Sequence, residues 1–469
     1  MPAHPIDFQI SSDVFSTPEL VQVFDEKTRY QRWLDFEAAL AKVQGEMGVI
    51  PLEAAEEICR KAKTEYLDMD MVHEGYLQSR NSLMPLIKGL RMVCEKGCGE
   101  YVHYGATTQD VLDTSEILEL QETVTIVFRD LRELEAICLD LAAKHRSTPM
   151  AARTHGQQAL PTTFGLKVVI WLTEIRRHIE RLKCVSEKIV AGQLGGAVGT
   201  MAALGPKAME IAGRTMGILG LKHSCVAWHN SRDNTGELAS VFSLLVTTLA
   251  KIANEVFQLQ KTEINELAEP APKGAVASST MPHKRNPVIC QRIIVLSRHV
   301  RYLTGTVVES MAHEHERDAR CLWSEWLAMP QLCIYTGTAL RYMLNVMSGL
   351  EVRADRMLEN LYLHKALIGS EWLLFRLSGR IGKMKSLEKL HELSNKASDA
   401  GISFADAVMD DPEIGSVMTR EEMAYLDYPE RYIGHAVQIV DQAIEETEKK
   451  RKSDPENIYE QLQTSQPHC

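Results

Sequence analysis

Long helical periodicities in the middle of the chain constrain its fold more than any other feature. Between positions 237 and 261, apolar residues recur every three or four places, as the buried face of a long bundle helix requires. Four other windows carry a similar pattern: 114–144, 163–190, 288–310 and 323–360. Because strand signals are few, the sequence predicts an all-α protein with an elongated bundle of five long helices.

The ends of these windows suggest the domain boundaries. We predict an N-terminal helical domain over 1–113, a central long-helix bundle over 114–360 and a C-terminal helical domain over 361–469. The end of the chain, EKKRKSDPENIYEQLQTSQPHC, is polar and is expected to be loosely held.

Composition limits the partners that such a chain can have. Its 469 residues include 52 basic and 63 acidic side chains, so the net charge of -11 disfavours nucleic acid and anionic membranes as partners. No apolar run approaches the ~18 residues of a membrane span, and the first residues lack the layout of a signal peptide. We therefore expect a cytoplasmic protein. The ten cysteines lack paired zinc-site spacing and are expected to be free thiols, mostly structural.

Three polar segments between the long helices are the candidates for chemistry. The first is KGAVASSTMPHKRNP, at 273–287, which brings together the hydroxyls of Ser278 and Ser279, the ammonium of Lys284 and the amide of Asn286. Such a set of groups suits a site that holds a carboxylate next to a base. The alternative is a polar loop that only connects two helices.

The second segment is RTHGQQALPTTFG, at 153–165. His155 stands among Arg153, Thr154 and Gln157, just before a helix that the Pro-Thr-Thr sequence is expected to start. This histidine is a candidate acid, although a lone histidine is more often structural.

The third segment is HYGATTQD, at 103–110. Gly105 permits a tight turn, and Thr107, Thr108 and Gln109 could donate hydrogen bonds at a helix N-terminus, which is a natural site for an anion. The alternative is an ordinary helix-capping sequence.

Taken together, the three segments resemble the signature regions of the fumarase/aspartase superfamily, in order and spacing, over nearly the whole chain. SSTMPHKRNP is a near-complete form of the most specific of these signatures. The resemblance implies three all-α domains, a central five-helix bundle and a homotetramer in which each active site collects the three segments from three subunits. It implies a small carboxylate substrate and neither a metal nor an organic cofactor.

The resemblance also implies a reaction and a role for each segment. Members remove a proton beside a carboxylate and expel a nitrogen or oxygen leaving group from the neighbouring carbon, commonly giving fumarate. Ser278 would be the base, acting as an alkoxide that Lys284 stabilises, and His155 would protonate the leaving group. The side chains implied to bind substrate are Thr107, Thr108, Gln109, Arg80, Asn81, Ser82, Arg153, Thr154, Gln157, Ser279, Met281, Asn286 and Arg317. For Arg317 a plainer interpretation is an ion pair with a neighbouring acidic residue, Asp318, Glu314 or Glu316.

The sequence departs from the family pattern at several positions. Ala277 replaces a usual glycine, and Gln291 replaces the glutamate that commonly supports the acid histidine; an amide cannot favour an imidazolium as a carboxylate does. In adenylosuccinate lyases a serine and an arginine hold the nucleotide phosphate where this chain has Leu322 and Trp326. Adenylosuccinate is therefore disfavoured as the substrate.

Other segments resemble the 3-carboxymuconate cycloisomerase branch of the superfamily, namely RNSLMPLIKGL, GQLGGAVGTMAALGPKAM, WHNSRD and EHERDARCLWSEWLAMP. Bacterial cycloisomerases typically have a tryptophan where this chain has His155, which belongs to the eliminating type. The sequence thus predicts a lyase that cleaves a C–N bond in a compact N-substituted succinate and releases fumarate. Two alternatives remain: a cycloisomerase that forms or opens a lactone, and a structural protein that has kept the fold without activity.

Overall fold

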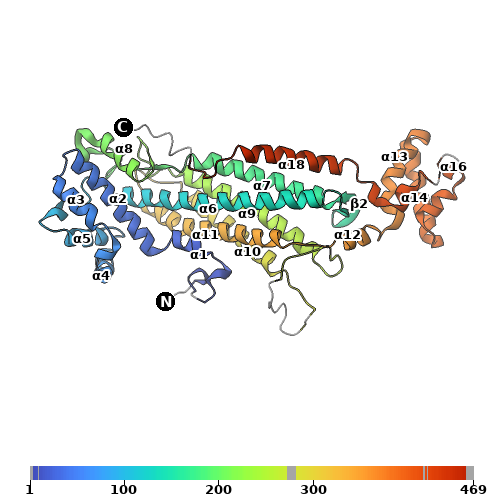
Figure 1. Cartoon of the computed structure of the whole chain (residues 1–469), viewed down its shortest axis with the longest axis horizontal. Coiled ribbons are helices and arrows are strands. Elements are labelled where there is room, and N and C mark those ends of the chain that lie inside the picture. The colour runs from blue at the N-terminus through green and yellow to red at the C-terminus, as the bar shows by residue number, and fades with distance from the viewer. Residues whose placement is uncertain are drawn as a thin grey trace.

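The computed structural model describes residues 4–8, 10–271, 281, 283–415, 418–419 and 421–460. These residues are mostly helical and form an elongated molecule (Figure 1). A small helical group at one end contains α2, α3, α4, α5 and α8, and a second group at the other end contains α13, α14 and α16. The all-α prediction is correct for the class of the fold.

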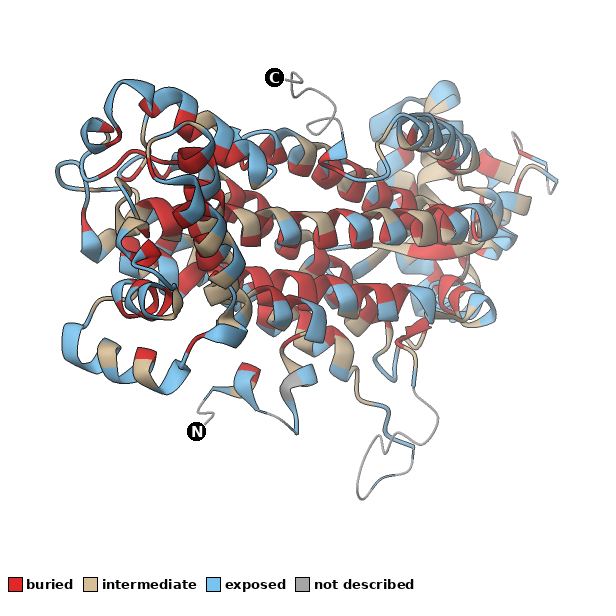
Figure 2. Cartoon of the chain, turned by 60° about the vertical axis from the view of Figure 1, so that its left-hand side comes forward, coloured by how far each residue is buried: buried red, intermediate tan, exposed pale blue. Residues whose placement is uncertain are grey.

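Five long helices run between these two ends. They are α6 (Thr108–Lys144), α7 (Phe164–Ser186), α9 (Asp233–Leu259), α10 (Val288–Glu309) and α11 (Ala319–Ser348). Their buried residues face one another along the bundle, while exposed residues cover its outside (Figure 2). Apolar side chains thus leave water along the whole length of the bundle, which is the main source of its stability.

Helix α9 is apolar enough to cross a membrane by length and composition alone, with a mean hydropathy of 1.4 over its best window. In the structure it is a core helix of the bundle, packed against α7, α10 and α11. Its side chains at Leu238, Phe242, Leu245, Leu249 and Ile252 are almost completely buried. The hydropathy of α9 therefore reflects burial inside the protein.

The window predicted as one helix over 323–360 contains two helices. α11 ends at Ser348, a two-residue strand β6 (Glu351–Val352) follows, and α12 (Ala354–Leu361) completes the window. Strand β6 pairs with β5 (Leu267–Ala268), so contact with a distant segment interrupts the helix. The continuous helix was therefore a wrong prediction.

The N-terminal helices are α1 (Pro18–Val23), α2 (Glu26–Glu46), α3 (Leu52–Lys61), α4 (Met69–Ser79) and α5 (Met84–Val93). Helix α8 (Ala208–Ile218) packs against α2, although it lies more than 160 residues away in the chain. The predicted boundary at 113 falls inside α6, which begins at Thr108.

The C-terminal helices are α13 (Ser370–Ile381), α14 (Lys383–Ala400), α15 (Phe404–Met409), α16 (Pro412–Gly415), α17 (Ala424–Asp427) and α18 (Ala436–Lys452). Residues of α13 to α17 share a small apolar core of their own, which includes Leu373, Leu390 and Phe404. Helix α18 instead returns to the bundle and packs along α7 and α6. The predicted boundary at 360 lies in the last turn of α12.

The expectation of a loosely held chain end is wrong for the described residues that follow α18. The carboxylate of Asp454 is fully buried and accepts hydrogen bonds from Arg132, Arg176 and Lys183 on the bundle. The ring of Tyr459 is also buried. A buried carboxylate held by three cations fixes this segment firmly to α6 and α7.

The sequence did not predict the short strands. β1 (Pro149–Thr154) and β2 (Gln157–Thr163) form an antiparallel hairpin between α6 and α7, and β3 (Ala191–Gly192) pairs with β4 (Lys222–His223). The side chain of Thr163 accepts a hydrogen bond from Leu166 N and caps α7, as expected for a helix start at this place.

Candidate active site

The third polar segment, at 103–110, leads into the N-terminus of α6, where a buried carboxylate joins three loops. Asp110 accepts hydrogen bonds from the backbone N–H of Thr107 at 3.0 Å, of Gly195 at 2.8 Å and of Gly196 at 3.0 Å. His229 Nε2 lies 3.0 Å from the same carboxylate. Asp110 and His229 were inside segments that the sequence singled out, but neither had been given a role.

Arg317 extends this arrangement from a segment 210 positions away. Its guanidinium donates to Thr107 Oγ1 at 3.3 Å and to the carbonyl oxygen of Ala197 at 3.1 Å. The ion pairs that were expected for Arg317 are made by Arg320 instead, with Asp318 at 2.7 Å and Glu314 at 2.8 Å. The structure thus places an exposed guanidinium beside a helix N-terminus, a combination that attracts carboxylates.

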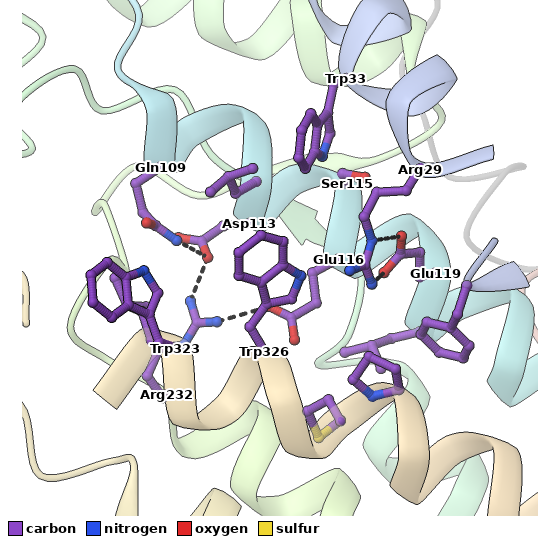
Figure 3. Close-up of a pocket in the computed structure, with 16 residues that line it drawn as sticks. Arg29, Trp33, Gln109, Asp113, Ser115, Glu116, Glu119, Arg232, Trp323 and Trp326 are labelled. Carbon is purple, nitrogen blue, oxygen red and sulfur yellow. Dashed lines mark hydrogen bonds and ion pairs between the residues drawn. The ribbon is translucent and has the colours of Figure 1, made fainter. Parts of the chain in front are cut away.

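A buried charge network lies one to two turns further along α6 (Figure 3). Gln109 donates to Asp113 at 2.8 Å, and Asp113 accepts from Arg232 at 2.9 Å. Arg232 also pairs with Glu116 at 2.9 Å and with Glu325 on α11. This network ties α6 to α11 and to the segment before α9.

Burial shifts the pKa values of the ionisable side chains in this network. Burial, and then repulsion from Glu325, raises the pKa of Glu116 well above its ordinary value. Burial also raises the pKa of Asp113, against the attraction of Arg232. Burial opposes the charged form of Arg232, but Asp113 and Glu325 outweigh it and raise its pKa. Arg232 is therefore a cation, and Glu116 takes up a proton more readily than an exposed glutamate.

The second polar segment is the tip of the β1–β2 hairpin. His155 and Gly156 form its two-residue turn, both with positive φ, at 53° and 77°, as in a type I′ turn. Thr154, His155 and Gln157 are all exposed at this tip. The ring of His155 is therefore accessible from outside the chain.

Arg153 is engaged in a structural ion pair below the hairpin tip. Its guanidinium donates to both carboxylate oxygens of Glu266, at 3.0 and 2.5 Å, and Glu266 is buried. Asn360 on α12 donates to the same carboxylate at 2.8 Å. The predicted role of Arg153 in substrate binding would require this bidentate pair to open, so the geometry favours a positioning role for it.

The first polar segment, at 273–287, is described only in part. Ser278 and Ser279 lie outside the described residues, while Met281 and Lys284 are exposed and Asn286 is half-buried. Lys284 follows a turn in which its backbone N–H donates to the carbonyl oxygen of Met281 at 3.0 Å.

The residues that follow Lys284 are anchored near the hairpin end of the bundle. Arg285 pairs with Glu351 at 2.7 Å and donates to the carbonyl oxygen of Glu269. The carboxylate of Glu269 caps α10 by accepting from Ile289 N at 3.0 Å and Cys290 N at 2.9 Å. This end of the segment is fixed to the strand pair β5–β6.

The residues Arg80 to Ser82 connect α4 and α5. Arg80 ends α4 in a left-handed conformation, with φ 53°, and its side chain is exposed. Asn81 Oδ1 accepts hydrogen bonds from the N–H groups of Leu83 at 3.0 Å and Met84 at 2.9 Å, so this side chain caps α5. Ser82 lines a cavity next to α2 and α4.

The structure brings Thr107, Thr108, Gln109 and Arg317 together and leaves the other two segments elsewhere. The hairpin follows the C-terminal end of α6, at the opposite end of the bundle from Thr107 (Figure 1). Because α6 has 37 residues, its two ends are about 55 Å apart. His155 and Thr107 of one chain therefore lie too far apart to act on one small substrate.

The chain resembles known lyases over nearly its full length. A family model described as Lyase matches residues 14–301. The N-acetyl-S-(2-succino)cysteine lyase of Dickeya dadantii (strain 3937) is 39% identical over 445 residues, which cover 95% of this chain and 98% of that protein. The adenylosuccinate lyase of Methanothermobacter thermautotrophicus is 38% identical, with 96% of this chain and 100% of that protein covered.

Solved structures agree with these relatives. The 3-carboxy-cis,cis-muconate lactonizing enzyme of Pseudomonas putida superimposes with a TM-score of 0.88 and 33% identity, over 94% of this chain and 99% of that one. A fumarate lyase from Mesorhizobium sp. BNC1 gives a TM-score of 0.86 with 29% identity, over 92% of this chain and 98% of that one. On these matches, the chain belongs to the lyase family of the fumarase/aspartase superfamily.

Proposed function

We propose that this protein releases fumarate from a succinyl-type substrate by β-elimination. The observation that carries the proposal is the hydrogen bond between Arg317 and Thr107, which builds a cationic site at the N-terminus of α6 from two segments that lie 210 positions apart. A guanidinium beside a helix N-terminus would hold one carboxylate of the substrate and stabilise the charge that develops when the neighbouring carbon loses its proton.

Ser278 is the proposed base in this reaction. A serine hydroxyl removes a proton from carbon only when its anion is stabilised, and Lys284, six positions later, is the proposed cation. Asn286 and Ser279 would bind the carboxylate next to the carbon that loses the proton, and Met281 would line the same site. No step in this scheme uses a metal or organic cofactor.

A complete site requires more than one copy of the chain. The hairpin with His155 and the N-terminus of α6 with Thr107 lie at opposite ends of a helix of about 55 Å, so a second subunit must supply one of them. We propose a homotetramer whose sites each collect the three segments from three subunits. The exposed tip of the hairpin, with Thr154 and Gln157 beside His155, is free to enter a neighbour's site.

The leaving atom is nitrogen or sulfur. An amine leaves only when it is protonated, which requires His155 as an acid, whereas a thiol with a pKa near about 8.5 leaves as a stable anion. Gln291, in the first turn of α10, cannot support an imidazolium as a glutamate would. This amide and the similarity to N-acetyl-S-(2-succino)cysteine lyases favour C–S cleavage, while the retained histidine and the adenylosuccinate lyase relatives favour C–N cleavage.

Adenylosuccinate remains disfavoured as the substrate. Leu322 is almost fully buried, and the Trp326 ring lies 5.8 Å from the guanidinium of Arg29, which is already paired with Glu119. Neither residue offers a hydroxyl or a free cation to a phosphate.

The proposal is tested by measuring fumarate release. The purified protein is incubated with N-acetyl-S-(2-succino)cysteine, adenylosuccinate and an N-succinyl amine, and fumarate is followed by its ultraviolet absorbance. We expect release from the first or the third compound, and Ser278→Ala should abolish it in a protein that still folds. Ser348→Ala, at an exposed serine of α11, is the matched control. Full activity of Ser278→Ala would refute the assigned base.

The second candidate function is cycloisomerisation of a carboxymuconate, which the similarity to the Pseudomonas putida lactonizing enzyme favours. Ring closure has no leaving group to protonate, so His155→Ala would then have little effect. Turnover of 3-carboxy-cis,cis-muconate, with no fumarate from any succinyl compound, would establish this alternative in place of the first.

A further inference from the structure

A groove lined by aromatic rings runs from the N-terminal part of α6 to the gap between α2 and α4. Its narrow part, about 50 Å³, lies between α6, α2 and α11, and its wide part, about 580 Å³, lies between α2, α4 and the start of α5. Both parts are lined by Phe24, Arg29, Trp33 and Trp326, so they lie next to each other. A volume of this size is typical of small-molecule sites.

The narrow part opens close to the proposed carboxylate site. Leu112 on α6 lies five residues after Thr107, and Leu322 on α11 lies five residues after Arg317. Along α6, the five residues from Thr107 to Leu112 rise about 8 Å, so a leaving group attached to a succinate held by Thr107 and Arg317 is within reach of the groove.

The walls of the groove present rings. Trp33 is buried and packs against Tyr30 with ring centroids 5.1 Å apart, while Tyr76 on α4 and Trp326 on α11 line the wide part and are partly exposed. Figure 3 shows Trp33 and Trp326 on different helices of the narrow part. Burial, and then the carboxylate of Glu26, raises the pKa of Tyr30 to about 12, so this ring is uncharged at neutral pH. Aromatic side chains that line a cavity can pack against another flat group.

The charges of the groove disfavour anions. Its two arginines are both held by carboxylates: Arg29 by Glu119, in two hydrogen bonds of 2.8 Å, and Arg232 by the buried network described above. Glu26 adds a further carboxylate at the entrance. An anionic ligand would therefore lose its hydration without gaining a free arginine.

We infer that the groove between Trp33, Tyr76 and Trp326 binds an uncharged aromatic part of the leaving group. This inference rests on the proposed function for the succinyl end of the substrate, and it adds the chemical class of the distal end. The substrate is then a dicarboxylate at one end and a flat, uncharged ring at the other.

The first experiment measures binding without turnover. Saturation-transfer NMR gives the dissociation constants of N-benzylacetamide and benzylphosphonate, which carry the same ring without and with a negative charge. We expect N-benzylacetamide to bind the wild-type protein, Trp326→Ala to weaken that binding about five- to ten-fold, and Trp326→Phe to weaken it less than about three-fold. Tyr302→Ala, which removes an exposed ring on α10, is the control and should change nothing.

Tighter binding of benzylphosphonate than of N-benzylacetamide would overturn the inference, and so would a Trp326→Ala variant that binds like Tyr302→Ala. If Trp326→Ala does not fold, Tyr76→Ala, which removes another ring of the wide part, takes its place, and unchanged binding in that variant overturns the inference equally.

The second experiment separates this inference from the proposed function. The ratio of kcat/KM for the N-(1,2-dicarboxyethyl) derivatives of benzylamine and methylamine should fall about ten-fold in Trp326→Ala. Fumarate release without any Trp326-dependent preference for the benzyl compound would leave the proposed function standing and refute the aromatic subsite. Trp326-dependent binding of N-benzylacetamide without fumarate release from any compound would support the aromatic subsite and refute the proposed function.

Discussion

Replacing Arg232 with alanine should destabilise the protein more than any surface substitution. The side chains of Arg232, Asp113 and Glu325 are each 1% exposed, so the variant would leave two buried carboxylates without their cation. Removing one partner of a buried ion pair typically costs about 3–5 kcal/mol. With an unfolding entropy of about 2.1 cal/mol/K per residue, 1 kcal/mol corresponds to about 1 °C in a chain of 469 residues, so Tm should fall by about 3–5 °C.

The assay is thermal unfolding followed by circular dichroism at matched protein concentration, because association would make Tm depend on concentration. The matched control is Arg214→Ala, which removes a 43% exposed arginine paired with Glu46 and should cost less than about 1 kcal/mol. The difference in Tm between the wild-type protein and Arg232→Ala should become smaller as the pH is lowered from about 7.5 to about 5.5. The pKa of a buried carboxyl without its cation is raised above the unfolded value, so its destabilisation is relieved as it takes up a proton. The reasoning would be refuted if Arg232→Ala lowered Tm no more than Arg214→Ala does, or if its difference in Tm from the wild-type protein grew as the pH fell.

Three further substitutions test other parts of the structure. Burial, and then Arg181, lower the pKa of His178 to about 4. Acidification from about pH 6.5 to 4 should therefore lower the free energy of unfolding by up to about 3 kcal/mol, because the unfolded chain takes up a proton at this histidine first. Urea unfolding measures this loss, which should be absent in His178→Gln. Gly165→Ala should lower Tm by about 1–3 °C, since its Cβ would lie 2.6 Å from a backbone atom of Arg146, whereas Gly213→Ala, in open space, should be neutral or stabilising. Asp454→Ala should expose the residues after α18 to limited proteolysis, and unchanged resistance would contradict their anchoring.

The helices of the bundle could be predicted because their signal is local. The apolar residues of α9 are spaced for one buried face, and the structure buries that face. The break between α11 and α12 could not be found in this way, because apolar residues continue through Leu350 and Val352. Gly349 packs so closely on Pro270 that a Cβ would lie 2.7 Å from it, and this contact with a distant segment accompanies the break.

The sequence identified the segments of the candidate site, but it could not predict the hydrogen bonds between them. The Thr107-to-Asp110 spacing contains a capping signal, yet nothing in the sequence shows that Asp110 also accepts from two glycines and faces His229. The hydrogen bond from Arg317 to Thr107 joins residues 210 positions apart, so neighbouring acids offered a simpler but wrong partner. Arg232 was missed for the same reason, since its partners lie on α6 and α11.

The number of residues in the β1–β2 hairpin sets how far the imidazole of His155, in its two-residue turn, projects from the bundle. In a hairpin, one added residue moves every following side chain to the opposite face of its strand, so an insertion at the tip would disturb the pairing that joins Thr154 to Gln157. Point substitutions along the strands leave the hairpin's length unchanged. In the proposed assembly, a hairpin of a different length would present the histidine at a different depth in the neighbouring subunit. One scaffold could in this way serve leaving groups of different size.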